Sequence, residues 1–498
     1  MSASAQPTIY WFRRDLRLQD NPALHWAVAR KEPVICVYIH DNQTKNHWSL
    51  GEASCWWLHH SLESLHSGLK SAGNRLRLFS GAPEKILTDL AAQSNAKAIT
   101  WNRRYEPESI ELDKHLKALL KDQGLTVNTT PGNLCHEPWQ VGRVDRNARY
   151  RESAADGMLP YKVFTAYWRA SLKQKSIPLT PSVKAIKGVN KKFTGEKKLK
   201  ELDLLPSLPW ADQFSQHWQP GEKSAAGVLQ AFCKRQIKEY DTSRDLPALS
   251  GTSGLSPHLA FGEITPRQIN AVVARKLKNK TLTADENTET FLKEIGWREF
   301  AYHLLYHFPH TTDLPLDKRF KKFPWNKPSP EELTRWQQGH TGIPLIDAGM
   351  RQLWQTGWMH NRVRMVVGSL LVKNMGYHWL EGARWFWDTL LDADLASNTM
   401  GWQWVAGSGA DAAPYFRVFN PVRQGERFDP DGEYIRQWVP EIAGLSKKTI
   451  HSPWTASETE LTEAGIELGK TYPHPVADLK NTRVEALERF AKIKTAQR

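Results

Sequence analysis

Two short runs in the C-terminal half of the chain place chemically different side chains on one helical face. Glu294 and Trp297 are three residues apart, and Asn361 and Met365 are four residues apart. Residues at these spacings lie on the same side of an α-helix. A carboxylate beside an indole can hydrogen-bond a planar ligand that the ring stacks on, and an amide beside a thioether offers one polar and one soft apolar contact. Taken alone, each face is more typical of an ordinary helix buried in a core.

A third candidate is a turn of small residues, Gly251-Thr252-Ser253-Gly254-Leu255-Ser256, in front of an expected helix. Hydroxyls and backbone N–H groups at a helix N-terminus can cradle a pyrophosphate. Most turns of this composition only connect two elements. The chain contains no GxGxxG and no GxxxxGK motif, so neither a dinucleotide fold nor a P-loop is indicated.

The amino-acid composition indicates which kinds of molecule the protein could bind. Lys and Arg total 67 against 53 Asp and Glu, for a formal charge of +14. This excess favours a polyanion such as nucleic acid, with a membrane surface or plain solubility as alternatives. The 22 Trp residues suit core packing, base stacking or redox chemistry.

Other classes of protein are not indicated. The sequence has no apolar run long enough for a bilayer and no secretory signal at its start. The four cysteines lack metal-ligand spacing, so we expect reduced thiols, no metal and a cytoplasmic protein.

The first part of the chain alternates short apolar strands with amphipathic helices. The predicted strands are Thr8 to Phe12, Val34 to Ile39, Leu76 to Phe79, Ala98 to Trp101 and Leu125 to Asn128. Alternation of this kind predicts a doubly wound parallel sheet covered on both faces, which binds ligands beyond the carboxyl ends of its strands.

Three regions follow from the pattern: an α/β domain over residues 1–134, a connector over 135–208 and a helical domain over 209–498. In the connector the periodicity stops, and a lysine-rich stretch between Lys184 and Lys200 is typical of a solvated segment. Predicted helices in the third region are Ala225 to Lys238, Pro266 to Leu277, Glu289 to His307, Ile346 to Met375 and an amphipathic tail from Arg483 to Arg498.

The string Trp11-Phe12-Arg13-Arg14-Asp15-Leu16-Arg17 follows the first strand. Physically it is a charged loop at a strand end, which a salt-bridged turn would explain. As a string it resembles the opening of the photolyase/cryptochrome family, and the resemblance runs nearly the whole length, most densely from Tyr240 to Trp438. It implies an antenna-binding α/β domain and a helical domain that holds FAD folded into a U.

The resemblance also implies a set of FAD contacts. Asp392 would pair with Arg364 across the cofactor, and Asn398 would face flavin N5. Many photolyases have Arg where this chain has Gly254, which leaves a backbone contact there. The full implied set is Tyr240, Thr252, Ser253, Gly254, Leu255, Ser256, Phe291, Glu294, Arg298, Asn361, Arg364, Asp392, Ala393, Asp394 and Asn398.

Catalytic and DNA-binding roles are implied in the same way. Glu294 and Asn398 would be catalytic. A neutral amide at N5 is compatible with a fully reduced flavin, whereas plant cryptochromes have Asp there. The residues implied to contact damaged DNA are Arg244, Glu294, Trp297, Asn361, Arg362, Met365, Trp404 and Arg417. Asn361 and Met365 fit a cyclobutane dimer, because six-four photolyases carry a histidine pair in this region.

Light harvesting and flavin reduction complete the implied machinery. Trp402, Trp379 and Trp325 would carry electrons between the flavin and the surface. The α/β domain would hold an antenna, either methenyltetrahydrofolate or a deazaflavin. The loop from Asn102 to Pro107 ends a strand where a ligand could bind, although Glu108 and Ser109 depart from the enterobacterial folate pattern.

The resemblance therefore predicts a monomeric, light-driven enzyme that repairs cyclobutane pyrimidine dimers in DNA with reduced FAD. The segment Phe386 to Asp394 looks as much like plant cryptochromes, and Thr399 and Met400 depart from the best-known photolyases. These features point to a bacterial branch near the plant photoreceptors. The alternatives are a cryptochrome-type photoreceptor without repair activity and a light-independent DNA-binding module.

Overall fold

The N-terminal part of the chain forms a five-stranded parallel sheet with the strand order β3-β2-β1-β4-β5. The structure is a computed structural model that describes residues 6–43, 48–144, 158–412 and 416–495. The strands are β1 (Thr8–Phe12), β2 (Val34–His40), β3 (Leu76–Ser80), β4 (Ala98–Asn102) and β5 (Thr126–Thr130). All five predicted strands are confirmed, with ends shifted by no more than two residues.

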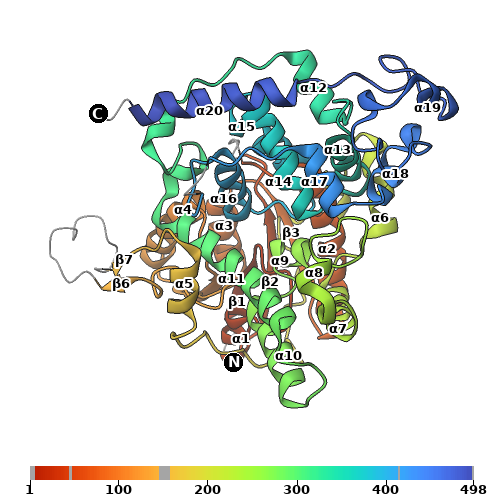
Figure 1. The fold of residues 1–498 in the computed structure, drawn as a ribbon. Coiled ribbons are helices and arrows are strands. Elements are labelled where there is room, and N and C mark those ends of the chain that lie inside the picture. The colour runs from red at the N-terminus through yellow and green to blue at the C-terminus, as the bar shows by residue number, and fades with distance from the viewer. Residues whose placement is uncertain (1–5, 44–47, 145–157, 413–415, 496–498) are drawn as a thin grey trace, which may run out of the picture.

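Helices cover both faces of this sheet (Figure 1). They are α1 (Pro22–Ala29), α2 (Glu52–Ser71), α3 (Pro83–Ser94) and α4 (Pro107–Asp122). In β1, Tyr10 and Phe12 pack in one cluster with α1 and α2, whereas Ile9 and Trp11 pack in another with α3 and α4. Since successive strand residues point to opposite faces, this division confirms the doubly wound architecture.

The charged loop after β1 joins the two halves of the molecule. Arg13 forms a buried ion pair with Asp113 at 2.8 Å. Arg17 is fully buried, and its Nη1 donates to the Gly262 carbonyl of the C-terminal half at 2.8 Å. Asp20 pairs with Arg267 from the same half at 2.9 Å. The motif thus forms a salt-bridged turn, as its charged residues suggest. Its hydrogen bond to Gly262 also joins the sheet to the helical half.

The region predicted to be a connector contains more structure than its sequence pattern indicates. It holds a two-stranded antiparallel ribbon, β6 (Arg143–Val144) and β7 (Met158–Leu159), and a helix, α5 (Phe164–Ser171), that lies beside α11 (Figure 1). Its lysine-rich stretch runs along the edge of the sheet, where the Lys197 N–H donates to the Leu78 carbonyl at 2.8 Å. The lysines stay exposed while the stretch covers an edge strand that would otherwise be open.

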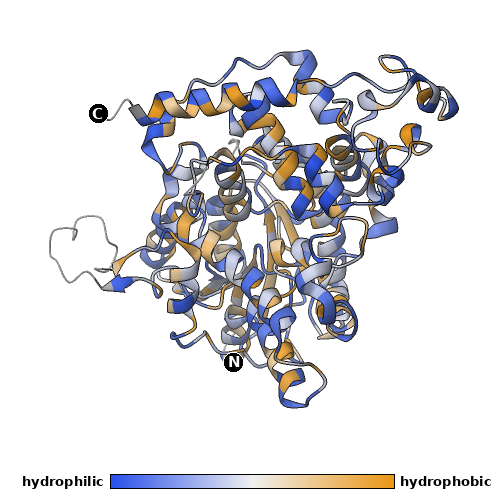
Figure 2. Cartoon of the chain, in the orientation of Figure 1, coloured by the Kyte–Doolittle hydropathy of each residue, from blue (hydrophilic) through white to orange (hydrophobic). Residues whose placement is uncertain are grey.

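The rest of the chain is helical, as predicted. From residue 209 onward the described residues contain no β-strand beyond one isolated bridge between Leu468 and Tyr472. Figure 2 shows hydrophobic residues concentrated in the central strands and on the inner sides of the helices. The helices are α6 (Phe214–His217), α7 (Glu222–Lys234), α8 (Tyr240–Ser243), α9 (Ser256–Ala260), α10 (Pro266–Lys278), α11 (Glu286–His307), α12 (Pro330–Gln338), α13 (Pro344–Thr356), α14 (Asn361–Ser369), α15 (Trp379–Thr389), α16 (Leu395–Ala406), α17 (Pro421–Phe428), α18 (Glu433–Trp438), α19 (Glu458–Glu463) and α20 (Leu479–Thr495).

The predicted continuous helix from Ile346 to Met375 is wrong. Helix α13 ends before Gly357, which has a φ of 67° and would bring a Cβ within 2.6 Å of Leu391 Cγ. Only glycine combines this left-handed backbone with so close a contact. Helix α14 then begins after His360, whose Nδ1 accepts from the Arg362 N–H at 3.2 Å. A π-helical turn, Leu370–Asn374, ends this stretch. The predicted tail helix is α20, and residues 496–498 lie outside the described part.

No helix in the described part of the chain is long and apolar enough to cross a bilayer.

A buried carboxyl group joins α11 to the start of the connector. Glu299 is only 6% exposed and accepts hydrogen bonds from the N–H groups of Cys135 at 2.8 Å and His136 at 3.2 Å. Burial raises the pKa of Glu299 to about 7, against the nearby positive charge of Arg298. Because the pKa is higher in the folded state, its contribution to stability is full in acid and is lost as pH rises through about 7.

We expect Glu299→Gln to gain stability relative to the wild type as pH rises from 5 to 8, by about 1–3 kcal/mol. The amide keeps an acceptor for both N–H groups and never ionises. Urea unfolding at the two pH values measures the change, with exposed Glu111→Gln as the control. A stability difference independent of pH would contradict the assignment.

Candidate functional site

Three of the segments implied to hold a cofactor meet in the structure. Gly251 lies against Ser243, and a Cβ at position 251 would be 2.3 Å from the Ser243 carbonyl oxygen. Ser256 then donates from its hydroxyl to Asp392 Oδ2 at 2.6 Å. The absence of a side chain at Gly251 therefore allows the small-residue turn to lie between the α8 segment and the acidic segment that precedes α16.

Asp392 is the acidic centre of this group. Arg364 Nη1 and Nη2 donate to its two carboxylate oxygens at 3.1 and 2.8 Å, a bidentate pair. The Asp392 side chain is 4% exposed and that of Arg364 is 24% exposed. The Arg364 Nε donates to the Met359 carbonyl at 2.7 Å, and this bond fixes the orientation of the guanidinium group. Asp392 and Arg364 thus pair in direct contact, and their position on either side of a cofactor stays a prediction.

Asp394 and Asn398 define the first turn of α16. Asp394 caps the helix by accepting from the Ser397 N–H at 2.9 Å, and it also accepts from the Tyr302 hydroxyl. The Asn398 Nδ2 donates to the Ala383 carbonyl of α15 at 3.0 Å. This bond turns the amide oxygen away from Ala383 and leaves it available as an acceptor. The half-buried Asn398 is therefore oriented by the protein itself.

Among the remaining residues implied to contact the cofactor, several are almost fully buried. Phe291 is 1% exposed and packs on the Tyr240 ring at 5.5 Å, and Ala393 is 3% exposed. Arg298 lies over the Tyr302 ring at 4.8 Å and donates to the Asn133 carbonyl at 3.0 Å. These side chains support the walls of the site, and their contact with a ligand stays a prediction.

Two arginines implied to grip DNA phosphates are paired with carboxylates. Arg244 donates to Glu294, and Arg362 Nη2 donates to Asp245 Oδ2 at 2.6 Å. The four side chains are between 18% and 33% exposed, so solvent and ligands can reach them. A phosphate would have to compete with these carboxylates. Burial raises the pKa of Tyr240, whose ring lies under Arg244 at 5.5 Å.

Trp297 already carries a stacked partner that the sequence did not suggest. The Phe164 ring of α5 lies 3.7 Å from the Trp297 ring at an angle of 11°. Trp168 of the same helix packs on Gly296, where a Cβ would be 2.5 Å from the indole. One face of Trp297 is therefore covered by Phe164, and the side chain stays partly exposed. The spacing of Phe164, Tyr167 and Trp168 was the available signal for this helix.

The other residues implied to contact damaged DNA lie on α14, on α16 and beyond it. Asn361 is exposed at the first position of α14, and Met365 is half-buried one turn later. The Trp404 ring lies 6.4 Å from the Phe419 ring. Trp404 and the exposed Arg417 both line a small cavity. Residues 413–415, directly before Phe416, lie outside the described part.

The three tryptophans of the implied electron path lie on different elements: Trp402 on α16, Trp379 at the start of α15 and Trp325 in the segment before α12. Trp402 and Trp379 are 4% and 1% exposed, and Trp325 is partly buried. The His378 ring lies 5.6 Å from Trp379 and 5.1 Å from Trp325, so it bridges them. This histidine was not singled out in the sequence. A Cβ at Gly382, one turn after Trp379, would be 2.0 Å from the Trp402 ring.

Gly382→Ala is therefore expected to displace Trp402 and to destabilise the fold by about 1–3 kcal/mol, because a methyl group would overpack the contact. Thermal unfolding and Trp402-dependent flavin photoreduction measure the two effects. Gly401→Ala is the control, since its Cβ would meet no atom within 4 Å. Equal behaviour of the two variants would contradict this placement.

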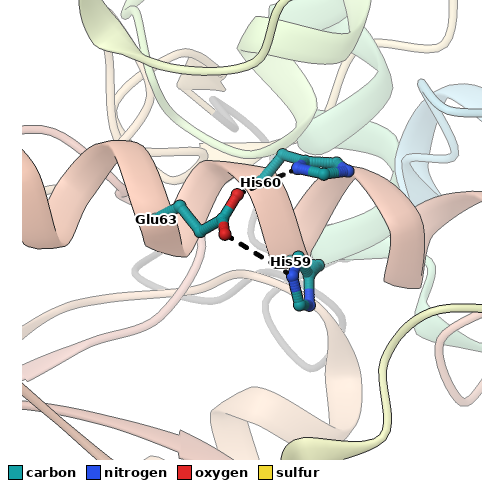
Figure 3. Close-up of side chains that lie close together, drawn as sticks. All are labelled: His59, His60 and Glu63. Atoms are coloured by element: carbon teal, nitrogen blue, oxygen red, sulfur yellow. Dashed lines mark hydrogen bonds and ion pairs between the residues drawn. The ribbon is translucent and has the colours of Figure 1, made fainter. Parts of the chain in front are cut away.

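A separate group of potential metal ligands lies on α2. Figure 3 shows the Glu63 carboxylate between His59 and His60, with Nε2 of His59 at 3.8 Å and Nδ1 of His60 at 3.0 Å. All three belong to one helix, and the side chain of Glu63 is 55% exposed. The short His60 to Glu63 contact explains the arrangement as a surface hydrogen bond, so we assign no metal to it.

Comparisons with known proteins agree with this arrangement. A sequence profile described as "DNA photolyase" matches residues 8–185, and one described as "FAD binding domain of DNA photolyase" matches residues 291–492. The chain is 47% identical to a deoxyribodipyrimidine photo-lyase of Agrobacterium fabrum over 99% of both proteins. It is 37% identical to cryptochrome-1 of Arabidopsis thaliana, over 99% of this chain and 71% of the plant protein.

Solved structures give the same result. A bacterial class III photolyase from Agrobacterium tumefaciens superposes with a TM-score of 0.92 and 44% identity over 99% of both chains. A cryptochrome from Synechocystis superposes with a TM-score of 0.87 and 29% identity, over 98% of this chain and 100% of that one. Both the sequence identity and the fold extend over essentially the whole length, and the chain belongs to the DNA photolyase/cryptochrome family.

Proposed function

We propose that the protein is a deoxyribodipyrimidine photo-lyase, which uses light to repair cyclobutane pyrimidine dimers in DNA. The observation that carries the proposal is Asn398. Its amide is oriented by the Ala383 carbonyl and presents a neutral acceptor, where plant cryptochromes carry an ionisable Asp. Photo-lyases from Agrobacterium, Synechococcus and Escherichia coli align with 96% or more of this chain, which supports the same conclusion.

The residues around Asp392 fit FAD. Ser253, Ser256 and the turn at Gly254, which has a φ of 65°, offer hydroxyl and backbone donors of the kind that hold a pyrophosphate. The buried Ser243 hydroxyl has no partner within the described residues, as expected beside a polar ligand. Arg364, held by Asp392, and Asn398 would contact the ring system. Reduced FAD, when bound, supplies the electron that opens the cyclobutane ring under blue or near-ultraviolet light.

The protein side chains bind and orient the damaged DNA. Arg244, Arg362 and Arg417 would hold phosphates, and binding should weaken as salt rises. Trp297, with Phe164 behind it, offers one open face for a base, and stacking contributes about 1–3 kcal/mol per base. Glu294 would release its bond from Arg244 and form a hydrogen bond with the dimer in its place. Asn361, Met365 and Trp404 would complete the contacts.

Illumination of the purified protein with an oligonucleotide that contains a thymine dimer tests the proposal. We expect intact thymines to be restored in light and not in darkness. The alternative from the same family is a photoreceptor without repair activity, and unchanged dimer content with a reduced flavin would establish it. A colourless protein would instead favour a DNA-binding module that has no flavin.

Several finer features also belong to this proposal. A methenyltetrahydrofolate or a deazaflavin would act as antenna near the carboxyl ends of β1 and β4, where the strand order reverses. The buried Arg14 Nη1 has no partner among the described residues and would be free to contact it. The protein would act as a monomer in the bacterial cytoplasm, consistent with its four free cysteines. Extraction and identification of the bound chromophores tests the antenna.

A further inference from the structure

Lys373 is a buried lysine close to the proposed DNA-binding residues. It is 2% exposed and lies in the π-helical turn Leu370–Asn374. Lysine is rarely buried to this extent without a carboxylate partner. Burial alone lowers the pKa of Lys373 to about 7, and no acidic side chain in the described part forms an ion pair with it. Such a costly placement calls for a specific role.

The amino group of Lys373 contacts two segments that are distant from it in sequence. Its Nζ donates to the Arg417 carbonyl at 3.2 Å and lies 3.4 Å from the centre of the Phe416 ring. It also lies at the C-terminal end of α16, where a Cβ on Gly407 would be 3.6 Å from Nζ. A cation is favoured both on an aromatic face and at a helix C-terminus. One side chain thus joins the end of α16 to residues 416–419.

These two segments carry proposed contacts to damaged DNA. Lys373, Trp404, Asp411, Arg417 and Phe419 line the same small cavity. The far face of the Phe416 ring stacks on Phe490 of α20 at 4.3 Å and 6°. Phe416 is therefore held between the amino group and the C-terminal helix, which lies along the edge of the helical half (Figure 1).

We propose that Lys373 is a positioning residue of the lesion pocket, which holds the end of α16 and residues 416–419 so that Trp404 and Arg417 face the damaged strand. The inference rests on the proposed repair function. Asn398 and Trp402 lie earlier on α16 and are positioned by contacts with Ala383 and Gly382. Loss of Lys373 should therefore weaken recognition of the dimer and spare the photochemistry.

The test compares Lys373→Met with Lys85→Met, which makes the same substitution at a side chain that is 79% exposed on α3. We expect Lys373→Met to raise the Kd for dimer-containing DNA about tenfold. This corresponds to about 1.4 kcal/mol, between the values for an exposed and a desolvated cation–π contact. Undamaged DNA, which offers phosphates to Arg417 but no dimer to Trp404, should lose less affinity than dimer-containing DNA. Repair per flash at saturating DNA and the flavin spectrum should match the wild type. This separation of affinity from turnover would not follow from general loss of structure.

The proposal is overturned if Lys373→Met binds dimer-containing DNA as Lys85→Met does, or if affinity and repair at saturation fall together. Should Lys373→Met fail to fold, Phe416→Leu keeps the lysine, removes the aromatic partner and is expected to show the same separation with a smaller loss of affinity. A wild-type protein that binds dimers but does not split them in light would instead contradict the proposed function, and the affinity comparison would still stand.

Discussion

Trp402→Phe is expected to slow light-driven reduction of the bound flavin by at least an order of magnitude. Trp402 is 4% exposed and packs against α15 at Gly382, one turn from Trp379, and His378 bridges Trp379 to Trp325. Phenylalanine keeps the aromatic packing but is far harder to oxidise than an indole. The proposed electron path would therefore be broken at Trp402, its member next to the flavin.

Reduction of the flavin with dithionite before illumination separates this effect from repair itself. We expect the prereduced variant to repair thymine dimers at close to the wild-type rate. Trp101→Phe is the matched control, because Trp101 is fully buried in the sheet and its Nε1 has no partner among the described residues. If the flavin of Trp402→Phe is photoreduced as fast as that of this control, Trp402 is not part of the electron path.

Asp392→Asn should yield a protein that is purified with little flavin and is destabilised by about 3–5 kcal/mol, the usual cost of breaking a buried ion pair. The substitution leaves the Arg364 guanidinium without a counter-charge. It also replaces one of the two carboxylate oxygens with an NH2 donor, so the remaining oxygen cannot accept from Ser256 and from both Arg364 nitrogens as the carboxylate does. Arg364 would then no longer be held where it could contact the cofactor. Both the stability and the cofactor content depend on the same carboxylate.

The flavin-to-protein absorbance ratio and the free energy of unfolding measure the two effects. Asp431→Asn removes an ion pair with Lys447 of 3.6 Å in which both side chains are more than two-thirds exposed. Such a pair contributes only about 0–1 kcal/mol. If Asp392→Asn retained the flavin content and stability of this control, the pair with Arg364 would not be part of the cofactor site.

Relation to cryptochromes does not alter the expected activity. The chain shares more than a third of its residues with the Arabidopsis cryptochrome, yet its identity to the Agrobacterium photo-lyase is higher. Family membership alone permits signalling or repair. The distinction depends on a few side chains, and Asn398 with its fixed amide favours repair.

Local sequence patterns determined much of the architecture. The central strands β1, β2 and β4 are short, mostly apolar runs, because a strand buried on both faces needs apolar residues at nearly every position. The helical C-terminal half and the two faces of β1 follow from the same periodicity. Motif resemblance also predicted that the segments around Asp392, Asn361 and Glu294 form the site. In each case the information lies within a few residues of the chain.

Contacts between distant segments were decided only by the tertiary structure. Gly357 ends α13 because Leu391, far along the chain, leaves no room for a Cβ. Phe164 covers one face of Trp297 from a helix that the broken periodicity of its region concealed. The partners of Arg244, Arg362 and Arg17 are equally invisible in the sequence, since a charged side chain does not indicate which of many opposite charges it will meet.

Lys373 shows the difference most clearly. In the sequence it is one of many basic residues, and its neighbours predict only a continuous helix. In the fold it is buried, without an acidic partner in the described part of the chain, against Phe416 and the end of α16. Sequence patterns determined which elements form because their causes are local. The burial and pairing of each charge depend on which elements meet, and only the packed structure decides that.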